Sequence, residues 1–227
     1  MRKNGLIAIF TLTTLSLSAQ FGINGAYRLN NAEQWKLTPF SSNQELAEFL
    51  GNGPAVGIDY WFRLKNVRIE FLPELNAGFY HSTISEVDGK SSVGQFSFFF
   101  NTNIYFLNFK GDCDCPTFSK HGPPLSKGIF FQLSPGVSYW NLDHTSGELE
   151  VKADATAFNI GAGLGLDIGL SDLVTITPVI GLRYTPSVTW DGLSKANGGI
   201  KEWILGDETS NIFQTNLGIR LGFRLDQ

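Results

Sequence analysis

The sequence predicts an all-β protein, an eight-stranded antiparallel transmembrane β-barrel. Apolar and polar residues alternate with period two in eight segments, as in strands with one apolar face. These segments run about 10 to 17 residues, whereas soluble strands average about 5 to 6 and a tilted bilayer-spanning strand needs about 9 to 11. Charged residues make up 17% and aromatic residues 13% of the chain. Soluble domains carry about 25% charged residues, so the composition favours an apolar exterior.

The first residues have the three-part layout of a secretory signal. Arg2 and Lys3 form a basic start, an apolar run follows, and Ala19 completes a small-residue cleavage site. The apolar run is too short to cross a bilayer as a helix. We therefore expect residues 1–19 to be a signal peptide and residues 20–227 to form the barrel.

The eight alternating segments are distributed along the whole of this expected barrel. Within residues 175–190, for example, Leu182, Val188 and Trp190 share the apolar face, opposite Arg183. The segments comprise residues 20–29, 55–64, 67–80, 95–109, 128–140, 155–170, 175–190 and 216–227.

The polar faces of these segments carry charges of both signs, which we expect inside the barrel. Eight strands enclose an interior just wide enough for side chains to fill. Because an unpaired charge would be costly there, the arginines and carboxylates should pair and form a plug. The expected network consists of Arg28, Asp59, Arg63, Arg68, Glu70, Glu74, Asp167, Arg183, Arg220 and Arg224.

Aromatic residues gather toward the ends of the segments. Such residues form girdles at the two membrane interfaces of transmembrane barrels, although packing within a core is the alternative. The expected girdle consists of Tyr27, Tyr60, Trp61, Phe79, Tyr80, Phe109, Tyr139, Trp140, Tyr184 and Trp190.

The connections between segments are predicted to alternate between long and short. Bacterial barrels place both termini and the tight turns in the periplasm and the longer loops outside. In the first long connection, Ser42 or Asn43 could cap a short helix that ends at Gly51. Long outer loops are expected at residues 30–53, 82–92, 144–154 and 191–208, and tight inner turns at residues 64–66 and 171–174.

Residues 110–127 form a long connection on the side where tight turns are expected. They contain both cysteines of the chain, Cys113 and Cys115, and three prolines that limit flexibility. Three interpretations of this connection stay open. It could be a stiff structural loop, it could hold a strained disulfide or redox pair, or it could form a soft-metal site completed by His121 and a neighbouring aspartate. The one-residue spacing is a weak match to zinc sites.

This architecture resembles the small outer-membrane barrels of the OmpA-transmembrane and OmpX kind, and more closely the PorT-like barrel proteins of Bacteroidetes. The resemblance covers residues 20–227 and rests on the signal ending in Ser-Ala-Gln and on the eight alternating strands. It implies an outer-membrane location with periplasmic termini, contact with lipid and lipopolysaccharide, and insertion by the barrel assembly machinery. The last strand looks like the insertion signal read by that machinery, although the chain ends in Asp226-Gln227. The expected signal consists of Leu217, Ile219, Leu221, Phe223 and Leu225.

No sequence motif argues strongly for an enzyme, a cofactor or a nucleic acid. His81, Ser82 and Glu86 are similar to the catalytic residues of lipid A deacylase barrels, but neighbours along a strand point to opposite faces. His144 beside Asp143 is expected to be a solvated loop histidine, and the net charge of -4 gives no case for nucleic-acid binding. We expect a non-enzymatic structural protein or an accessory subunit of an envelope assembly, with residues 110–127 as a partner site. A lipid-modifying enzyme and a narrow pore are the alternatives.

Overall fold

The computed structural model describes residues 20–39, 47–63, 68–85, 88–106, 128–171, 173–197 and 203–224. The predicted signal peptide, residues 1–19, and the cysteine-containing connection, residues 110–127, lie outside these ranges. Within them, no helix is long and apolar enough to cross a membrane.

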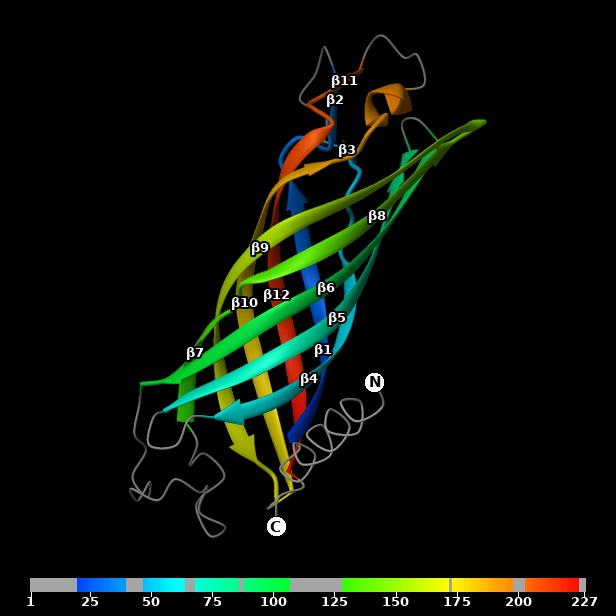
Figure 1. The fold of residues 1–227 in the computed structure, drawn as a ribbon. Coiled ribbons are helices and arrows are strands. Elements are labelled where there is room, and N and C mark those ends of the chain that lie inside the picture. The colour runs from blue at the N-terminus through cyan, green and yellow to red at the C-terminus, as the bar shows by residue number, and fades with distance from the viewer. Residues whose placement is uncertain are drawn as a thin grey trace, which may run out of the picture.

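The described chain folds into a closed ring of antiparallel strands, which confirms the predicted fold class (Figure 1). β7 and β8 pair with the same two neighbours, β6 and β9, so together they fill one of eight positions in the wall. The ring closes because β12 pairs with β1 and β10 pairs with β9. The wall strands are β1 (Gln20–Ala32), β4 (Gly53–Arg63), β5 (Ile69–Ile84), β6 (Gly89–Tyr105), β7 (Gly128–Leu133), β8 (Gly136–Ser146), β9 (Leu149–Gly169), β10 (Val174–Thr189) and β12 (Thr209–Arg224).

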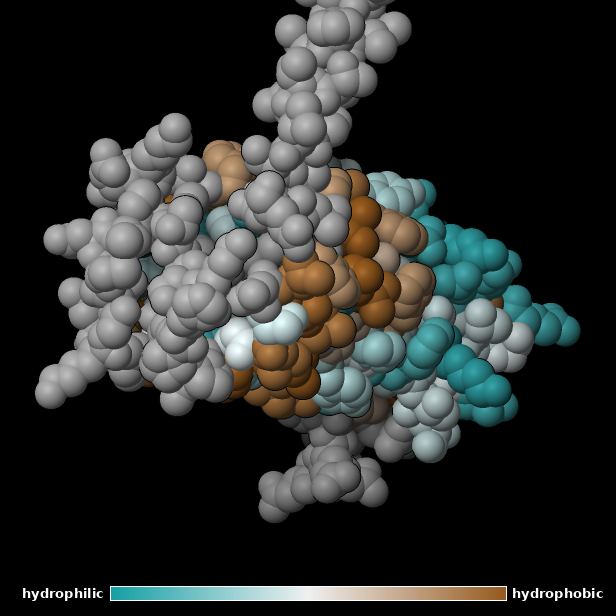
Figure 2. All heavy atoms as spheres, turned by 90° about the horizontal axis from the view of Figure 1, so that it is seen from below, coloured by the Kyte–Doolittle hydropathy of each residue, from teal (hydrophilic) through white to brown (hydrophobic). Residues whose placement is uncertain are grey.

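The outer face of the wall is apolar, and we call this surface the apolar belt. Every wall strand contributes exposed large apolar side chains or half-buried ones, and Ile58 and Leu182 are 61% and 65% exposed. Figure 2 shows hydrophobic residues gathered on the wall in the view from below. Soluble monomers rarely expose apolar surface on this scale, whereas a barrel in lipid requires it.

Two of the predicted outer loops are instead strand hairpins. β5 continues to Ile84 and β6 begins at Gly89, while β8 and β9 are separated only by Gly147 and Glu148. Gly147 has a φ of +57°, which suits the tight turn. At these tips the outward side chains are polar and the inward ones pack under the cap, so the pattern of apolar exterior and polar interior ends although backbone pairing continues. The predictions for residues 82–92 and 144–154 were therefore wrong.

A small cap covers the end of the barrel opposite the start of β1 and the end of β12 (Figure 1). It consists of β2 (Lys36–Pro39), β3 (Ala47–Glu48), β11 (Trp203–Leu205) and the 3-10 helix η3 (Leu193–Asn197), with β2 in the centre of a three-stranded sheet. The predicted helix ending at Gly51 was wrong, because Ala47 pairs with Leu37 as a strand residue and Phe49 is buried.

Beneath the cap lies an apolar cluster, which we call the cap core. Trp190 meets Trp35 with a centroid distance of 5.4 Å and Phe49 with one of 6.2 Å. The indole of Trp35 donates a hydrogen bond to the Glu208 carbonyl at 2.9 Å. The cap core consists of Ala32, Trp35, Leu37, Phe49, Leu50, Tyr80, Ile84, Val93, Trp140, Leu142, Val151, Val188, Trp190, Leu193 and Ile212.

A β-bulge near the end of β10 turns its last residues inward. The register with β12 shifts between Thr185 and Val188, and Ser187 has a φ of +52°. Val188 and Trp190 are consequently buried in the cap core, although the alternation places them on the outer face with Leu182. A bulge adds one residue to a strand and so reverses the alternation that follows it.

The aromatic-girdle prediction is only partly right. Tyr27, Phe79 and Tyr139 are exposed on the outer wall, while Tyr60 and Tyr184 are half-buried. The remaining described members pack inside the barrel or the cap core, which is the alternative considered for them. These buried members are Trp61, Tyr80, Trp140 and Trp190.

Gly53 and Gly25 test whether β4 and β5 approach each other too closely near the cap to admit a side chain. A Cβ at Gly53 would lie 2.1 Å from the Phe79 carbonyl oxygen, whereas a Cβ at Gly25 would meet nothing within 4 Å. We expect Gly53→Ala to lower the free energy of unfolding by about 1–3 kcal/mol because the backbone must move. Gly25→Ala should change it by less than about 0.5 kcal/mol. Denaturant unfolding from lipid vesicles measures both, and equal effects would contradict this account.

Candidate functional site: the polar lumen

Arg28 is the centre of a hydrogen-bond network in the upper lumen. Its side chain is 1% exposed. Its Nε donates to Asn216 Oδ1 at 2.8 Å and its Nη2 donates to Asn76 Oδ1 at 2.5 Å. Its Nη1 donates to Tyr80 Oη at 2.8 Å and to Gln95 Oε1 at 2.9 Å. Arg28 thus has four neutral acceptors from three strands, rather than the carboxylate partner that the sequence predicts.

The network extends through amide and hydroxyl side chains. Gln214 Nε2 donates to Gln95 Oε1 at 3.1 Å and to Asn30 Oδ1 at 2.8 Å. Gln95 Nε2 donates to Ser138 Oγ at 3.0 Å, and Asn159 also donates to that hydroxyl. Side chains from opposite walls therefore meet across the barrel interior.

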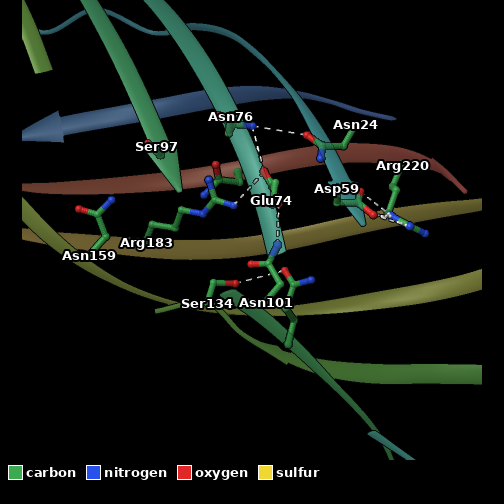
Figure 3. Close-up of polar contacts among 12 residues, drawn as sticks. Asn24, Asp59, Glu74, Asn76, Ser97, Asn101, Ser134, Asn159, Arg183 and Arg220 are labelled. Carbon is green, nitrogen blue, oxygen red and sulfur yellow. Dashed lines mark hydrogen bonds and ion pairs between the residues drawn. The ribbon is translucent and has the colours of Figure 1, made fainter. Parts of the chain in front are cut away.

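Asp59 and Arg220 form a two-pronged ion pair lower in the lumen (Figure 3). Arg220 Nε lies 2.8 Å from Asp59 Oδ2, and Arg220 Nη2 lies 2.5 Å from Asp59 Oδ1. The side chains of Arg220 and Asp59 are 12% and 1% exposed, respectively. Bidentate charge-assisted bonds of this kind are strong and fix the orientation of the guanidinium plane.

The Arg183 guanidinium contacts the aromatic ring of Phe99 and lies farther from the carboxylate of Glu74. Its guanidinium carbon lies 3.7 Å from the centroid of Phe99, a cation–π contact, and its Nη2 lies 3.9 Å from Glu74 Oε1. Glu74 also accepts hydrogen bonds from Asn76 Nδ2 at 3.0 Å and Asn101 Nδ2 at 2.6 Å (Figure 3). Glu74 therefore joins the charged layer to the amide network above it.

Tyr105 connects two further buried carboxylates near the end opposite the cap. Its hydroxyl lies 2.8 Å from Glu70 Oε2 and 2.5 Å from Asp167 Oδ2. Thr177 also donates to Asp167. A tyrosine hydroxyl has one proton, so it donates to one carboxylate at a time.

The rest of the predicted charge network lies elsewhere or is not described. Arg68 is exposed just before β5 begins, so the prediction that it lies in the interior was wrong. The side chains of Arg63 and Arg224 lie outside the described part of the chain. Sequence reasoning missed the neutral members of the network, although they occupy inward positions of the same alternation. These are Asn30, Asn76, Tyr80, Gln95, Asn101, Tyr105, Ser138, Asn159, Gln214 and Asn216.

A small cavity lies between the charged layers of the described lumen. The cavity measures about 70 Å³ and is lined by Arg28, Asp59, Glu74, Arg183 and Arg220, among others. A water molecule needs roughly 10–15 Å³ of such space, so the cavity has room for a few water molecules. Small inward residues, including Ala26 and Gly218, leave this room in the wall.

The candidate catalytic residues do not assemble into a catalytic site. His81 is exposed, while Ser82 is half-buried and donates to the Glu48 carbonyl at 2.5 Å. His144 is fully buried and bonds Ser91 Oγ at 2.9 Å, so the prediction of a solvated loop histidine was wrong. Glu86 lies outside the described ranges. Within those ranges, no three His, Cys, Asp or Glu side chains form a group that could hold a metal ion.

No family model matches the chain, and no curated protein matches it. Solved structures with a similar fold include Neisserial surface protein A (12% identity, 91% of this chain and 97% of that chain, TM-score 0.46). Ail of Yersinia pestis is also similar (10% identity, 91% of this chain and 99% of that chain, TM-score 0.47). So is a major outer membrane protein of Thermus thermophilus (11% identity, 92% of this chain and 100% of that chain, TM-score 0.48). Since these TM-scores lie below 0.5, the barrel architecture is established by this chain's own strand pairing.

The buried Asp59–Arg220 pair yields a prediction for stability. Asp59→Asn should lower the free energy of unfolding by about 3–5 kcal/mol, because it leaves a buried guanidinium without its counter-charge. The double variant Asp59→Leu/Arg220→Met should cost less than Asp59→Asn alone, because no charge then stays buried.

A matched exposed pair serves as the control. Lys152 Nζ lies 2.5 Å from Glu150 Oε1, but both side chains are more than half exposed. Lys152→Met should lower the free energy of unfolding far less than Asp59→Asn does, as is usual for surface pairs. Denaturant unfolding from vesicles measures the free energy of unfolding of the wild type and all three variants. Equal losses for Asp59→Asn and Lys152→Met would refute the conclusion that Asp59 and Arg220 form a buried, stabilising ion pair.

Proposed function

We propose that this protein is a non-enzymatic integral protein of the bacterial outer membrane, serving as a structural or accessory subunit of an envelope assembly. The apolar belt carries the proposal, because a closed barrel with large exposed apolar residues is stable only in lipid. The belt contacts membrane lipid, and lipopolysaccharide in the outer leaflet. The polar side chains that meet across the lumen, together with the cap above them, support a scaffold rather than a pore.

The orientation that we propose places the cap outside the cell and the chain termini in the periplasm. β1 begins and β12 ends at the end opposite the cap (Figure 1). The three connections at that end lie between β4 and β5, between β6 and β7, and between β9 and β10. Long connections at the outer end and tight periplasmic turns are usual in bacterial barrels.

The connection between β6 and β7 supports the accessory role. Tyr105 pairs with Phe130, so the strands that flank residues 110–127 meet at the end opposite the cap. We propose that these residues reach the periplasm and bind a protein partner there. Membership of the PorT-like barrels of Bacteroidetes, and a disulfide or redox role for Cys113 and Cys115, stay predictions.

The last strand supports insertion by the barrel assembly machinery. Leu217, Ile219, Leu221 and Phe223 are exposed on the outer face of β12, as the expected insertion signal requires. Leu225 lies outside the described residues. We propose that this face is the surface that the machinery binds during assembly.

The proposal is tested first by location and conductance. We expect the protein to fractionate with outer membranes, to migrate faster on gels unless heated, and to leave planar bilayers electrically silent. Steady single-channel currents would contradict the closed lumen. A change in lipid A or phospholipid composition that depends on His81 would contradict a non-enzymatic role.

The accessory role is tested by partner capture from native membranes with and without residues 112–126. We expect at least one envelope protein to be recovered with the full chain and lost with the deletion, while the barrel still folds. A matched variant that carries Cys113→Ser and Cys115→Ser separates a role of the thiols from a role of the loop. Identical sets of captured proteins from the full chain and the deletion would refute a docking role.

A further inference from the structure

His144 is the buried titratable group that the proposed function leaves unexplained. It lies on the inward face of β8, where His144 is opposite Ser91 of β6 on one side and Val151 of β9 on the other. Its exposed fraction is 0%. Its outward neighbours Asn141 and Thr145 are exposed and polar, so this part of β8 lies beyond the apolar belt.

The imidazole connects the barrel wall to the cap. Its Nδ1 is 2.9 Å from Ser91 Oγ, and its ring packs edge-on against Phe49 with a centroid distance of 5.0 Å. Phe49 directly follows β3 and its amide donates to the Trp35 carbonyl at 3.0 Å. Phe49 also meets Trp190, so the His144 ring packs directly beneath the aromatic part of the cap core.

The site tolerates a neutral ring better than a charged one. Nε2 of His144 is buried and has no hydrogen-bond partner among the described residues. A protonated ring carries a donor on both nitrogens, so Nε2–H would be charged and unpaired beside Phe49. Burial lowers the pKa of the His144 imidazole, and the Asp143 carboxylate opposes that shift only in part.

The other charged groups on the surrounding elements do not offset this cost. Lys152 pairs with Asp143 and with Glu150 on the outer face, and Lys36 pairs with Glu48 in the cap. The charged residues on the elements that pack against His144 are Lys36, Glu48, Lys90, Asp143, Glu150, Lys152, Asp154 and Lys195, together with Asp167 at the far end of β9.

We propose that His144 is an acid-sensitive latch that holds the cap on the barrel at neutral pH and releases it at acidic pH. The closed state binds the neutral ring, whereas in the open state the exposed imidazole has an ordinary pKa of about 6.5. As pH falls below that value, the open state takes up more protons than the closed state. The ratio of open to closed molecules then rises by up to about tenfold per pH unit. Release uncovers the Gln95 and Arg28 network that lies below the cap core.

The latch is tested by fluorine NMR between pH 8 and pH 5. The protein is labelled with 5-fluorotryptophan and reconstituted in phospholipid vesicles. Trp35 and Trp190 lie in the cap core, whereas Trp61 pairs with Gln20 at the other end of the barrel and serves as an internal reference. We expect solvent-exposed Trp35 and Trp190 signals to gain intensity as pH falls from about 6.5 to 5, over which the open-to-closed ratio rises by at most about 30-fold. The Trp61 signal should not move.

Variants separate the latch from a general effect of acid. His144→Gln and His144→Phe should keep the cap closed across the whole pH range, and His81→Gln, which alters an exposed histidine, should open like the wild type. Heat-modifiable migration on gels verifies that each variant is folded, and His144→Gln decides the matter if His144→Phe does not fold. Unchanged tryptophan signals in the wild type, or opening of His144→Gln at the same pH as the wild type, would overturn the proposal.

Discussion

The pairing of β1 with β12 is the constraint on which the rest of the structure depends. It runs over the full 13 residues of β1, from Gln20 opposite Arg224 to Ala32 opposite Ile212. In lipid, an unpaired strand edge costs several kcal/mol for each exposed polar group, so a sheet must close on itself. Closure also determines the size of the interior, which eight strands make just large enough for side chains.

The narrow interior explains the two kinds of filling. Within the membrane, polar side chains from opposite walls satisfy one another, and Arg28 has four neutral acceptors around its guanidinium. Beyond the apolar belt, water surrounds the projecting strands, and their inner face is covered by an apolar core under the cap. The interior is therefore polar where the exterior is apolar, and apolar where the exterior is polar. His144 lies in the second region, so it is a titratable group in apolar surroundings.

Much of the wall could be predicted from the sequence because its physical cause is local. The alternation of Leu217 to Phe223 with Gly218 to Gly222 follows from a strand that separates lipid from a polar lumen. The same reasoning failed where that separation ends. Residues 82–84 and 145–146 are strand but lack the pattern, because both faces meet water or the cap. It also failed at Val188, where a bulge that leaves no trace in the alternation reverses the two faces.

By itself, the sequence determined the number of wall strands, their lipid-facing residues and the inward position of most of the charges, because strand periodicity couples each residue to one of two environments. Only the tertiary structure decided which inward groups meet. Asp59 and Arg220 are 161 positions apart in the chain, and Arg28 and Asn216 are 188 apart. Ring closure, strand register and the cap bring such residues together. No local pattern encodes the meeting of His144 with Phe49, because that contact depends on how the long β1–β4 connection folds back over the barrel.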